Sequence, residues 1–184
     1  MQIENTFIDG CYIIHDTIFN DSRGCFFESF NKSIFKEQTG LSINFVQDNQ
    51  SVSTSKGVLR GLHFQHGEFS QAKLVRVISG TVLNVAVDLR KNSKTFGNHI
   101  VVKLSDTSNK QIFIPRGFAH GFLVLSDRAN FFYKCDNFFD KKSRSGIMYN
   151  DPDLKIDWQF PEDEIILSEN DKVQPFLRDC EILF

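Results

Sequence analysis

The chain of 184 residues lacks the features that mark several large classes of protein. Its only cysteines, Cys11, Cys25, Cys135 and Cys180, form no C-x-x-C pair, so the sequence predicts neither a zinc site nor a disulfide framework. Its 21 basic and 23 acidic residues form no run of one sign, which argues against nucleic-acid partners and membrane-surface binding. The start, MQIENTFIDG, has no signal-peptide pattern, and no apolar stretch approaches the ~20 residues that span a membrane. We therefore expect a soluble, cytoplasmic protein.

Short strands separated by turns dominate the sequence from about residue 44 to residue 135. Turn residues recur roughly every 8 to 12 positions, which is typical of an all-β antiparallel sandwich or jelly-roll barrel. The length fits a single domain over residues 1–184. Ser79-Gly80, between LVRVI and TVLNVAV, predicts a hairpin turn because glycine supplies the positive φ that such turns require. Residues 31–39 predict a short helix capped by Asn31, and the polar tail after residue 140 predicts a few short helical turns.

The stretch GVLRGLHFQHGEF carries two residues that suit a binding or catalytic site, Arg60 and His63. Strict alternation along a strand points these two side chains to opposite faces. They can share a site only if Gly61 allows a bulge or if the site forms between two subunits. The alternative is a histidine satisfied inside the barrel and an exposed arginine.

A metal site would need histidines placed differently from those in this chain. The stretch IPRGFAHGFLVLS resembles the second motif of the cupin superfamily, whose metal-binding members also carry an H-x-H pair on one strand face. Here His63 and His66 are spaced H-x-x-H, which sends their rings to opposite faces. A site built on His63, His66, Glu68 and His120 is therefore disfavoured, and we expect a metal-free barrel.

Several polar residues interrupt the apolar strands. Lys73, Arg76, Asn84 and Asp88 follow the pattern of residues on the wet face of a sheet. Among them Lys73 has the best claim to a role in a site, because its position groups it with Val75 and Val77 in an otherwise apolar row, where a charge is unusual.

Tyr133, in NFFYKCDNFFD, is one of 3 tyrosines in a chain with 20 phenylalanines. Alternation places it on the same strand face as Phe131 and Cys135. A buried phenol normally finds a hydrogen-bond partner, so its position alone leaves structural and chemical roles open.

Taken together, five stretches resemble one family. They are DSRGCFFESFN, FVQDNQSVSTSKGVLRGLHFQ, QAKLVRVISGTVLNVAVDLRKNSKTFG, IFIPRGFAHGFLVLS and NDPDLKIDW, in this order. They are similar to the signatures of dTDP-4-dehydrorhamnose 3,5-epimerases and their relatives that act on nucleotide-linked 4-keto-6-deoxy sugars. The resemblance implies a cupin-type jelly roll, a homodimer, a nucleotide-diphospho-sugar substrate, and catalysis with no metal and no cofactor.

The resemblance also implies roles for individual residues. His63 would be the general base, Asp171 the carboxylate that orients it, and Tyr133 the general acid. Lys73 would steady the enolate oxygen, and His120 would line the same pocket. These residue types suit the chemistry, because inversion beside a ketone needs a base on one ring face and a different proton donor on the other.

Further residues match the surroundings of the nucleotide. Arg60 would hold the diphosphate, to which a planar guanidinium can make paired hydrogen bonds. The others, some of them reaching across the dimer, are Arg23, Phe26, Glu28, Gln47 and Asn49.

The chain departs from the family where many members have two tyrosines and this one has Phe138 and Phe139. A phenyl ring can still stack on the substrate but cannot donate a hydrogen bond. The nucleotide and sugar therefore stay open between a dTDP-hexose and, for instance, a GDP-linked 6-deoxy-heptose. Inversion at carbon 3 alone, a 3,4-ketoisomerase and a non-catalytic sugar-nucleotide-binding barrel are the alternative functions.

Overall fold

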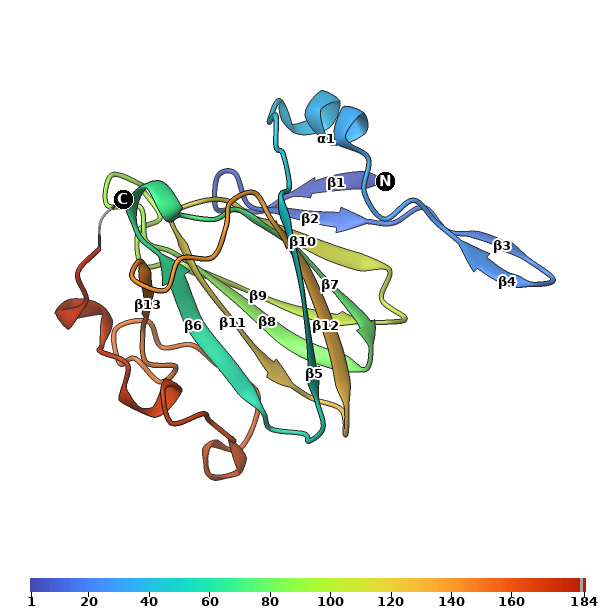
Figure 1. The fold of residues 1–184 in the computed structure, drawn as a ribbon. Helices are drawn as coiled ribbons and strands as arrows, with labels where there is room; N and C mark the ends of the chain where they lie inside the picture. The colour runs from blue at the N-terminus through green and yellow to red at the C-terminus, as the bar shows by residue number, and fades with distance from the viewer. Residues whose placement is uncertain (183) are drawn as a thin grey trace.

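The structure, a computed structural model, describes residues 1–182 and 184. Two antiparallel sheets face each other (Figure 1), which confirms the predicted all-β jelly-roll class. The first sheet has the strand order β1 (Gln2–Asn5), β2 (Tyr12–His15), β10 (Lys110–Ile114), β7 (Lys73–Ser79), β12 (Ala129–Cys135) and β5 (Gln47–Ser53). The second has the order β13 (Arg144–Gly146), β6 (Leu59–Gln65), β11 (Phe118–Val124), β8 (Thr81–Asp88) and β9 (His99–Ser105).

The remaining elements lie outside the two sheets. The hairpin of β3 (Phe19–Asp21) and β4 (Gly24–Phe26) extends away from the sheets as an arm (Figure 1). The helix and the short 3-10 turns are α1 (Lys32–Thr39), η1 (Gly67–Phe69), η2 (Glu162–Glu164), η3 (Asp171–Val173) and η4 (Leu177–Asp179). Within the described part of the chain, no helix is long and apolar enough to cross a membrane.

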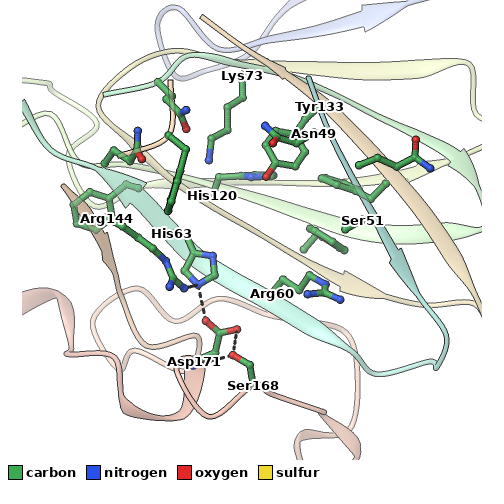
Figure 2. Close-up of a pocket in the computed structure, with 17 residues that line it drawn as sticks. Asn49, Ser51, Arg60, His63, Lys73, His120, Tyr133, Arg144, Ser168 and Asp171 are labelled. Carbon is green, nitrogen blue, oxygen red and sulfur yellow. Dashed lines mark hydrogen bonds and ion pairs between the residues drawn. The ribbon is translucent and has the colours of Figure 1, made fainter. Parts of the chain in front are cut away.

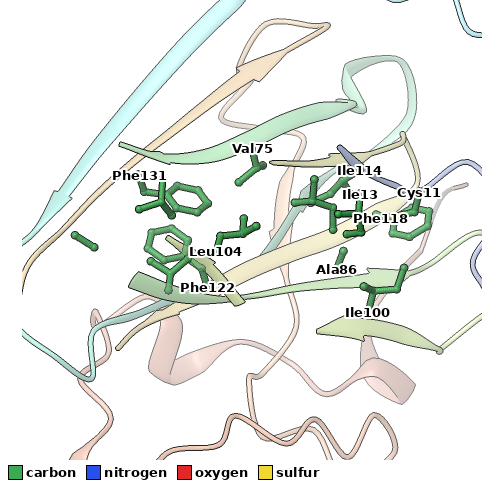
Figure 3. Packing of buried hydrophobic residues seen from close by; sticks show 14 of the residues in the cluster. Cys11, Ile13, Val75, Ala86, Ile100, Leu104, Ile114, Phe118, Phe122 and Phe131 are labelled. Carbon is green, nitrogen blue, oxygen red and sulfur yellow. The ribbon is translucent and has the colours of Figure 1, made fainter. Parts of the chain in front are cut away.

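Apolar side chains fill the space between the sheets, cover the outer face of the second sheet and cover part of the outer face of the first. Between the sheets, Val75 and Phe131 of the first sheet belong to one buried cluster with Phe122 of the second (Figure 3). The C-terminal segment covers the outer face of the second sheet, where Trp158 is buried. Phe35 of α1 packs on Phe113 of the first sheet. Polar side chains from both sheets enter the space between the sheets beside the apolar cluster that lies there, where they line a cavity with Phe122 and Phe131.

The helix follows the prediction. The Asn31 side chain accepts hydrogen bonds from the backbone N–H groups of Ser33 and Ile34, at 3.0 and 3.1 Å, as an N-cap residue does. Gly40 ends the helix with a φ of 73°, in the left-handed region that glycine adopts most easily.

The predicted hairpin at Ser79-Gly80 is wrong. Strand β7 pairs with β10 and β12, whereas β8 pairs with β11 and β9, so the chain crosses from one sheet to the other at Gly80. The positive φ is present, at 85°, and a Cβ there would clash with the Arg128 carbonyl oxygen. A turn glycine reports local backbone geometry, which does not distinguish a hairpin from a crossover.

Strands β1 to β4 and β13 were not predicted from the sequence. They have 3 or 4 residues each, and β1, β3 and β4 are mostly exposed, so they carry no apolar alternation to detect. The short helical turns expected after residue 140 are confirmed by η2, η3 and η4.

A bulge brings Arg60 and His63 to the same side of β6. His63 pairs with His120 of β11 and Arg60 pairs with Phe122, so two residues of β6, Gly61 among them, oppose the single Gly121. An extra residue in one strand reverses the alternation beyond it. The structure therefore uses the first of the two arrangements that the sequence allowed.

Replacing Gly61 tests this bulge. Gly61→Ala is expected to destabilise the protein by about 2–4 kcal/mol, because its φ is 131° and its Cβ would lie 2.5 Å from Gly121 Cα. Thermal unfolding measures the loss. Gly24→Ala is the matched control, since Gly24 has a φ of 126° and no atom within 4 Å of its Cβ. Equal melting temperatures for the two variants would show that the close approach carries no constraint.

Candidate active site

A cavity of about 370 Å³ opens between the two sheets (Figure 2). The first sheet contributes Asn49, Lys73 and Tyr133 to its lining, and the second contributes His63 and His120. Because β7 and β12 belong to one sheet and β6 and β11 to the other, the two sets of side chains enter the cavity from opposite walls.

His63 and Asp171 are hydrogen-bonded to each other at one wall of the cavity. His63 Nε2 lies 2.5 Å from Asp171 Oδ1, and the Ser168 hydroxyl donates to Asp171 Oδ2 at 2.9 Å (Figure 2). Asp171 is only 3% exposed. Burial acts to raise the pKa of Asp171, but its hydrogen bonds with His63 and Ser168 outweigh that effect and hold the pKa below its ordinary value. The carboxylate is therefore ionised at neutral pH and holds His63 with Nε2 as the donor.

Lys73 and Tyr133 lie together at the other wall. The Lys73 ammonium is 5.7 Å from the centroid of the Tyr133 ring, and no hydrogen bond or ion pair to Lys73 is found among the described residues. Burial lowers the pKa of Lys73 and raises the pKa of Tyr133. At neutral pH the phenol therefore keeps its proton and is available as a donor.

His120 lies deeper in the cavity. It is buried, stacks on Phe131 at a centroid distance of 5.9 Å, and has Nε2 2.8 Å from Asn84 Oδ1. Asn84 and Asp88, for which a wet face was the usual interpretation, are instead fully buried inside the barrel. Asn84 is held there by His120, and Asp88 accepts hydrogen bonds from Arg90, Ser93 and Thr95.

Comparison with known proteins connects this geometry to an activity. Residues 5–179 match the family model described as dTDP-4-dehydrorhamnose 3,5-epimerase. The chain is 51% identical over 175 residues to the enzyme of that name from Methanothermobacter thermautotrophicus, covering 95% of this chain and 93% of the relative. The chain belongs to the dTDP-4-dehydrorhamnose 3,5-epimerase family.

Solved structures agree with that assignment. The dTDP-4-dehydrorhamnose 3,5-epimerase of Elizabethkingia anophelis superposes with a TM-score of 0.94 at 52% identity, covering 97% of each chain. The 3,5-epimerase of Legionella pneumophila in complex with dTDP-4-keto-L-rhamnose superposes with a TM-score of 0.93 at 46% identity, covering 98% of this chain and 94% of that one.

The cavity of this epimerase brings together seven of the predicted site residues. They are Asn49, Arg60, His63, Lys73, His120, Tyr133 and Asp171. Gln47 stands behind them, donating to Asn49 Oδ1 at 2.9 Å, while its oxygen accepts from the Phe139 backbone N–H at 2.9 Å.

Four predicted residues lie outside this cavity. Arg23 and Phe26 are on the exposed β3–β4 arm, and Glu28 follows it. Arg23 pairs with Asp21 at 2.6 Å on the arm itself. Phe138 is 62% exposed and is not among the lining residues, whereas its neighbour Phe139 is.

Sequence reasoning missed Arg144 and Ser168, and of the two phenylalanines that it placed at the sugar site, Phe139 rather than Phe138 lines the cavity. Arg144 Nη2 lies 3.4 Å from His63 Nε2, and it comes from the unpredicted strand β13. Ser168 precedes Asp171 by three residues, a spacing that could have suggested a local hydrogen bond in LSEND. For Arg144, nothing in the local sequence points to the base.

His66 is separated from the site. Its ring packs against Phe64, at a centroid distance of 4.8 Å, and against Phe184. In the described residues, no group of three or more His, Cys, Asp or Glu side chains is placed to hold a metal ion.

The pKa of Asp171 predicts a pH-dependent contribution to stability. A carboxylate whose pKa is lowered on folding stabilises the protein above its unfolded pKa of about 3.9, and this contribution disappears as the pH falls through the folded pKa. Asp171→Asn is therefore expected to cost about 1–3 kcal/mol at pH 7, and less as the pH drops below about 4.

Denaturant unfolding of both proteins between pH 2.5 and pH 7 checks this expectation. Asp48→Asn removes an exposed partner of Lys134, at 2.8 Å, and is expected to cost under about 1 kcal/mol. A loss in Asp171→Asn that persists undiminished at the lowest pH contradicts the assignment of an ionised Asp171.

Proposed function

We propose that this chain inverts carbon 3 and carbon 5 of a dTDP-linked 4-keto-6-deoxy-hexose, with His63 as base and Tyr133 as acid. One observation carries the proposal: the His63–Asp171 pair and the Tyr133 phenol enter one cavity from opposite sheets, with Lys73 beside the phenol. Inversion requires that arrangement, since a proton returned from the side it left changes nothing.

His63 removes the proton next to the ketone. Its Nε2–H is held by the Asp171 carboxylate, so the other ring nitrogen, Nδ1, is left to act on the sugar. The carboxylate fixes the tautomer and stabilises the imidazolium that forms. Because the pKa of Asp171 is lowered, this carboxylate stays charged when His63 accepts the proton from the sugar.

Lys73 stabilises the enolate. Removing a proton beside a ketone places negative charge on the carbonyl oxygen, and a positive charge in a water-poor cavity stabilises it strongly. The ammonium has no carboxylate partner among the described residues, so its charge remains available to the substrate. The ketone itself acidifies both neighbouring carbons, which is why we infer a reaction that needs no cofactor.

Tyr133 returns a proton to the opposite ring face. Burial raises the pKa of this phenol, so it is protonated at neutral pH, while the charge of Arg60 acts the other way and favours the phenolate left after transfer. A phenylalanine would fill the same space without a transferable proton.

The dTDP nucleotide is favoured by the names of the relatives, and a GDP-linked heptose is the alternative. The Arg60 guanidinium, which lines the cavity and lies 3.5 Å from Ser53 Oγ, is suited to the diphosphate. Phe139, half exposed at the cavity, offers a ring for stacking. All four cysteines are free, which fits a cytoplasmic enzyme.

The protein works as a homodimer in this proposal. The β3–β4 arm carries Arg23 and Phe26 away from the chain's own cavity, and Phe26 is 70% exposed. An exposed aromatic ring on a projecting arm suits contact with another molecule. We infer that each arm, with Glu28, completes the nucleotide site of the partner.

Proton exchange in D2O tests the reaction. With dTDP-4-keto-6-deoxyglucose, deuterium is expected at carbons 3 and 5, followed by NMR of each ring proton. Exchange at carbon 3 alone would restrict the activity to one centre, and exchange only with a GDP-linked 4-keto-6-deoxy-heptose would change the substrate. No exchange with any of these compounds would sink the epimerase proposal.

Two variants assign the roles in the same assay. His63→Ala is expected to abolish exchange, since it removes the base. Tyr133→Phe is expected to retain exchange but to slow inversion by about 10²–10⁴-fold. Unchanged inversion in Tyr133→Phe would remove that residue from the mechanism.

Hybrid dimers test the shared site. Arg23→Ala/Phe26→Ala is expected to raise KM, and His63→Ala to be inactive, each as a pure dimer. After the two are mixed and re-associated, half of the hybrid's sites combine an intact cavity with an intact arm, so activity at low substrate is expected to reappear. If each arm served its own cavity, mixing would restore nothing. Light scattering supplies the oligomeric state.

A further inference from the structure

Two histidines stand side by side in the cavity with different partners. His63 of β6 and His120 of β11 are directly paired across the two strands. His63 is hydrogen-bonded to a carboxylate, that of Asp171, whereas His120 is hydrogen-bonded to a neutral amide, that of Asn84. A carboxylate partner stabilises an imidazolium, and an amide partner does so far less. The environment of His63 therefore favours an imidazolium more than the environment of His120 does.

The burial of Asn84 is unfavourable for the stability of the fold. This residue is fully buried between Val82 and Ala86 on β8, and its Nδ2 finds no hydrogen-bond partner among the described residues. Leaving a buried polar group unpaired destabilises the folded state. The one hydrogen bond that the amide does make goes to His120.

We propose that Asn84 is a positioning residue that holds His120 as a neutral imidazole, so that Lys73, and not His120, supplies the positive charge for the enolate. The inference rests on the proposed function and adds to it the division of charge between two residues. The amide oxygen of Asn84 accepts from Nε2–H, which leaves Nδ1 as a lone pair. That lone pair can accept a hydrogen bond from the Lys73 ammonium or from the sugar.

The groups around His120 act in the same direction. Lys73 faces it from β7, His63 from β6, Tyr133 from β12 and Asn84 from β8. Burial first, then the charges of Lys73 and His63, hold the pKa of His120 well below its ordinary value. The described residues lining the cavity offer His120 no carboxylate of its own, because the only one, Asp171, is bonded to His63.

NMR of the imidazole nitrogens tests the charge state without substrate. In the wild-type protein, His120 is expected to show the Nε2–H tautomer and no titration between pH 5 and pH 9. Asn84→Asp is expected to make His120 titrate with its pKa raised into the neutral range, since a buried carboxylate replaces the amide. Titration of His120 in the wild-type protein, or an Nδ1–H tautomer, would overturn the proposal.

A double-mutant comparison tests the consequence for catalysis. Lys73→Met is expected to lower kcat about 10²–10³-fold in the wild-type background, as loss of one preorganised charge does. In the Asn84→Asp background the same change is expected to cost about tenfold or less at pH 6, because a protonated His120 takes over part of the charge. This residual activity is expected to fall as the pH rises and His120 loses its proton.

Asn84→Leu is the matched variant. It removes the hydrogen bond without adding a charge, so the tautomers of His120 mix while the full dependence on Lys73 remains. Equal losses from Lys73→Met in the wild-type and Asn84→Asp backgrounds would mean that Asn84 acts only in packing, and the proposal would fall. If D2O exchange is absent while His120 behaves as expected, the proposed function fails and the assignment of a neutral His120 stands.

Discussion

The close approach of β6 and β11 at Gly61 and Gly121 fixes how the site is assembled. A Cβ on Gly121 would lie 3.0 Å from the Arg60 carbonyl oxygen, and one on Gly61 would lie still closer to the backbone of β11. The strands can approach this closely because both positions are glycines. The bulge that results directs the side chains of Arg60 and His63 toward the same cavity, while His63 stays opposite His120. The placement of Arg60, the proposed diphosphate ligand, and of His63, the proposed base, thus depends on a contact between two glycines that take no part in the chemistry.

The second requirement is the delivery of Asp171 from a distant part of the chain. Its segment belongs to the C-terminal region that covers the outer face of the second sheet. That region is held by the buried Asp151 carboxylate, which accepts from the backbone N–H groups of Asp153, Leu154 and Leu177. A single buried carboxylate thus connects two distant parts of this segment by satisfying three backbone donors. Asp171 lies within this segment, between Asp151 and Leu177, and its contacts with His63 and Ser168 fix its carboxylate at the cavity.

Sequence reasoning predicted the all-β class, the capped helix and seven residues that share the cavity, because these depend on local pattern or on long motifs. It was wrong at Gly80, where a turn glycine gives no information on which sheet comes next. It left a wet face as the usual interpretation for Asn84 and Asp88, because alternation identifies the two faces of a strand but not which face has buried polar partners. Arg144 was missed since its strand is three residues long, and its proximity to His63 depends entirely on tertiary pairing.

The two sheets divide the chemistry between them. The second sheet carries the proposed base and His120, which we propose is neutral, while the first carries the proposed acid and the Lys73 ammonium. Because the packing of Phe122 on Phe131, at a centroid distance of 3.8 Å, joins the sheets just beneath these groups, the separation of base and acid is set by the apolar core. In the proposed mechanism, a sugar held between the sheets therefore has the base on one face and the acid on the other. The stereochemical outcome, inversion rather than simple exchange, is in this view a property of the barrel as much as of any single residue.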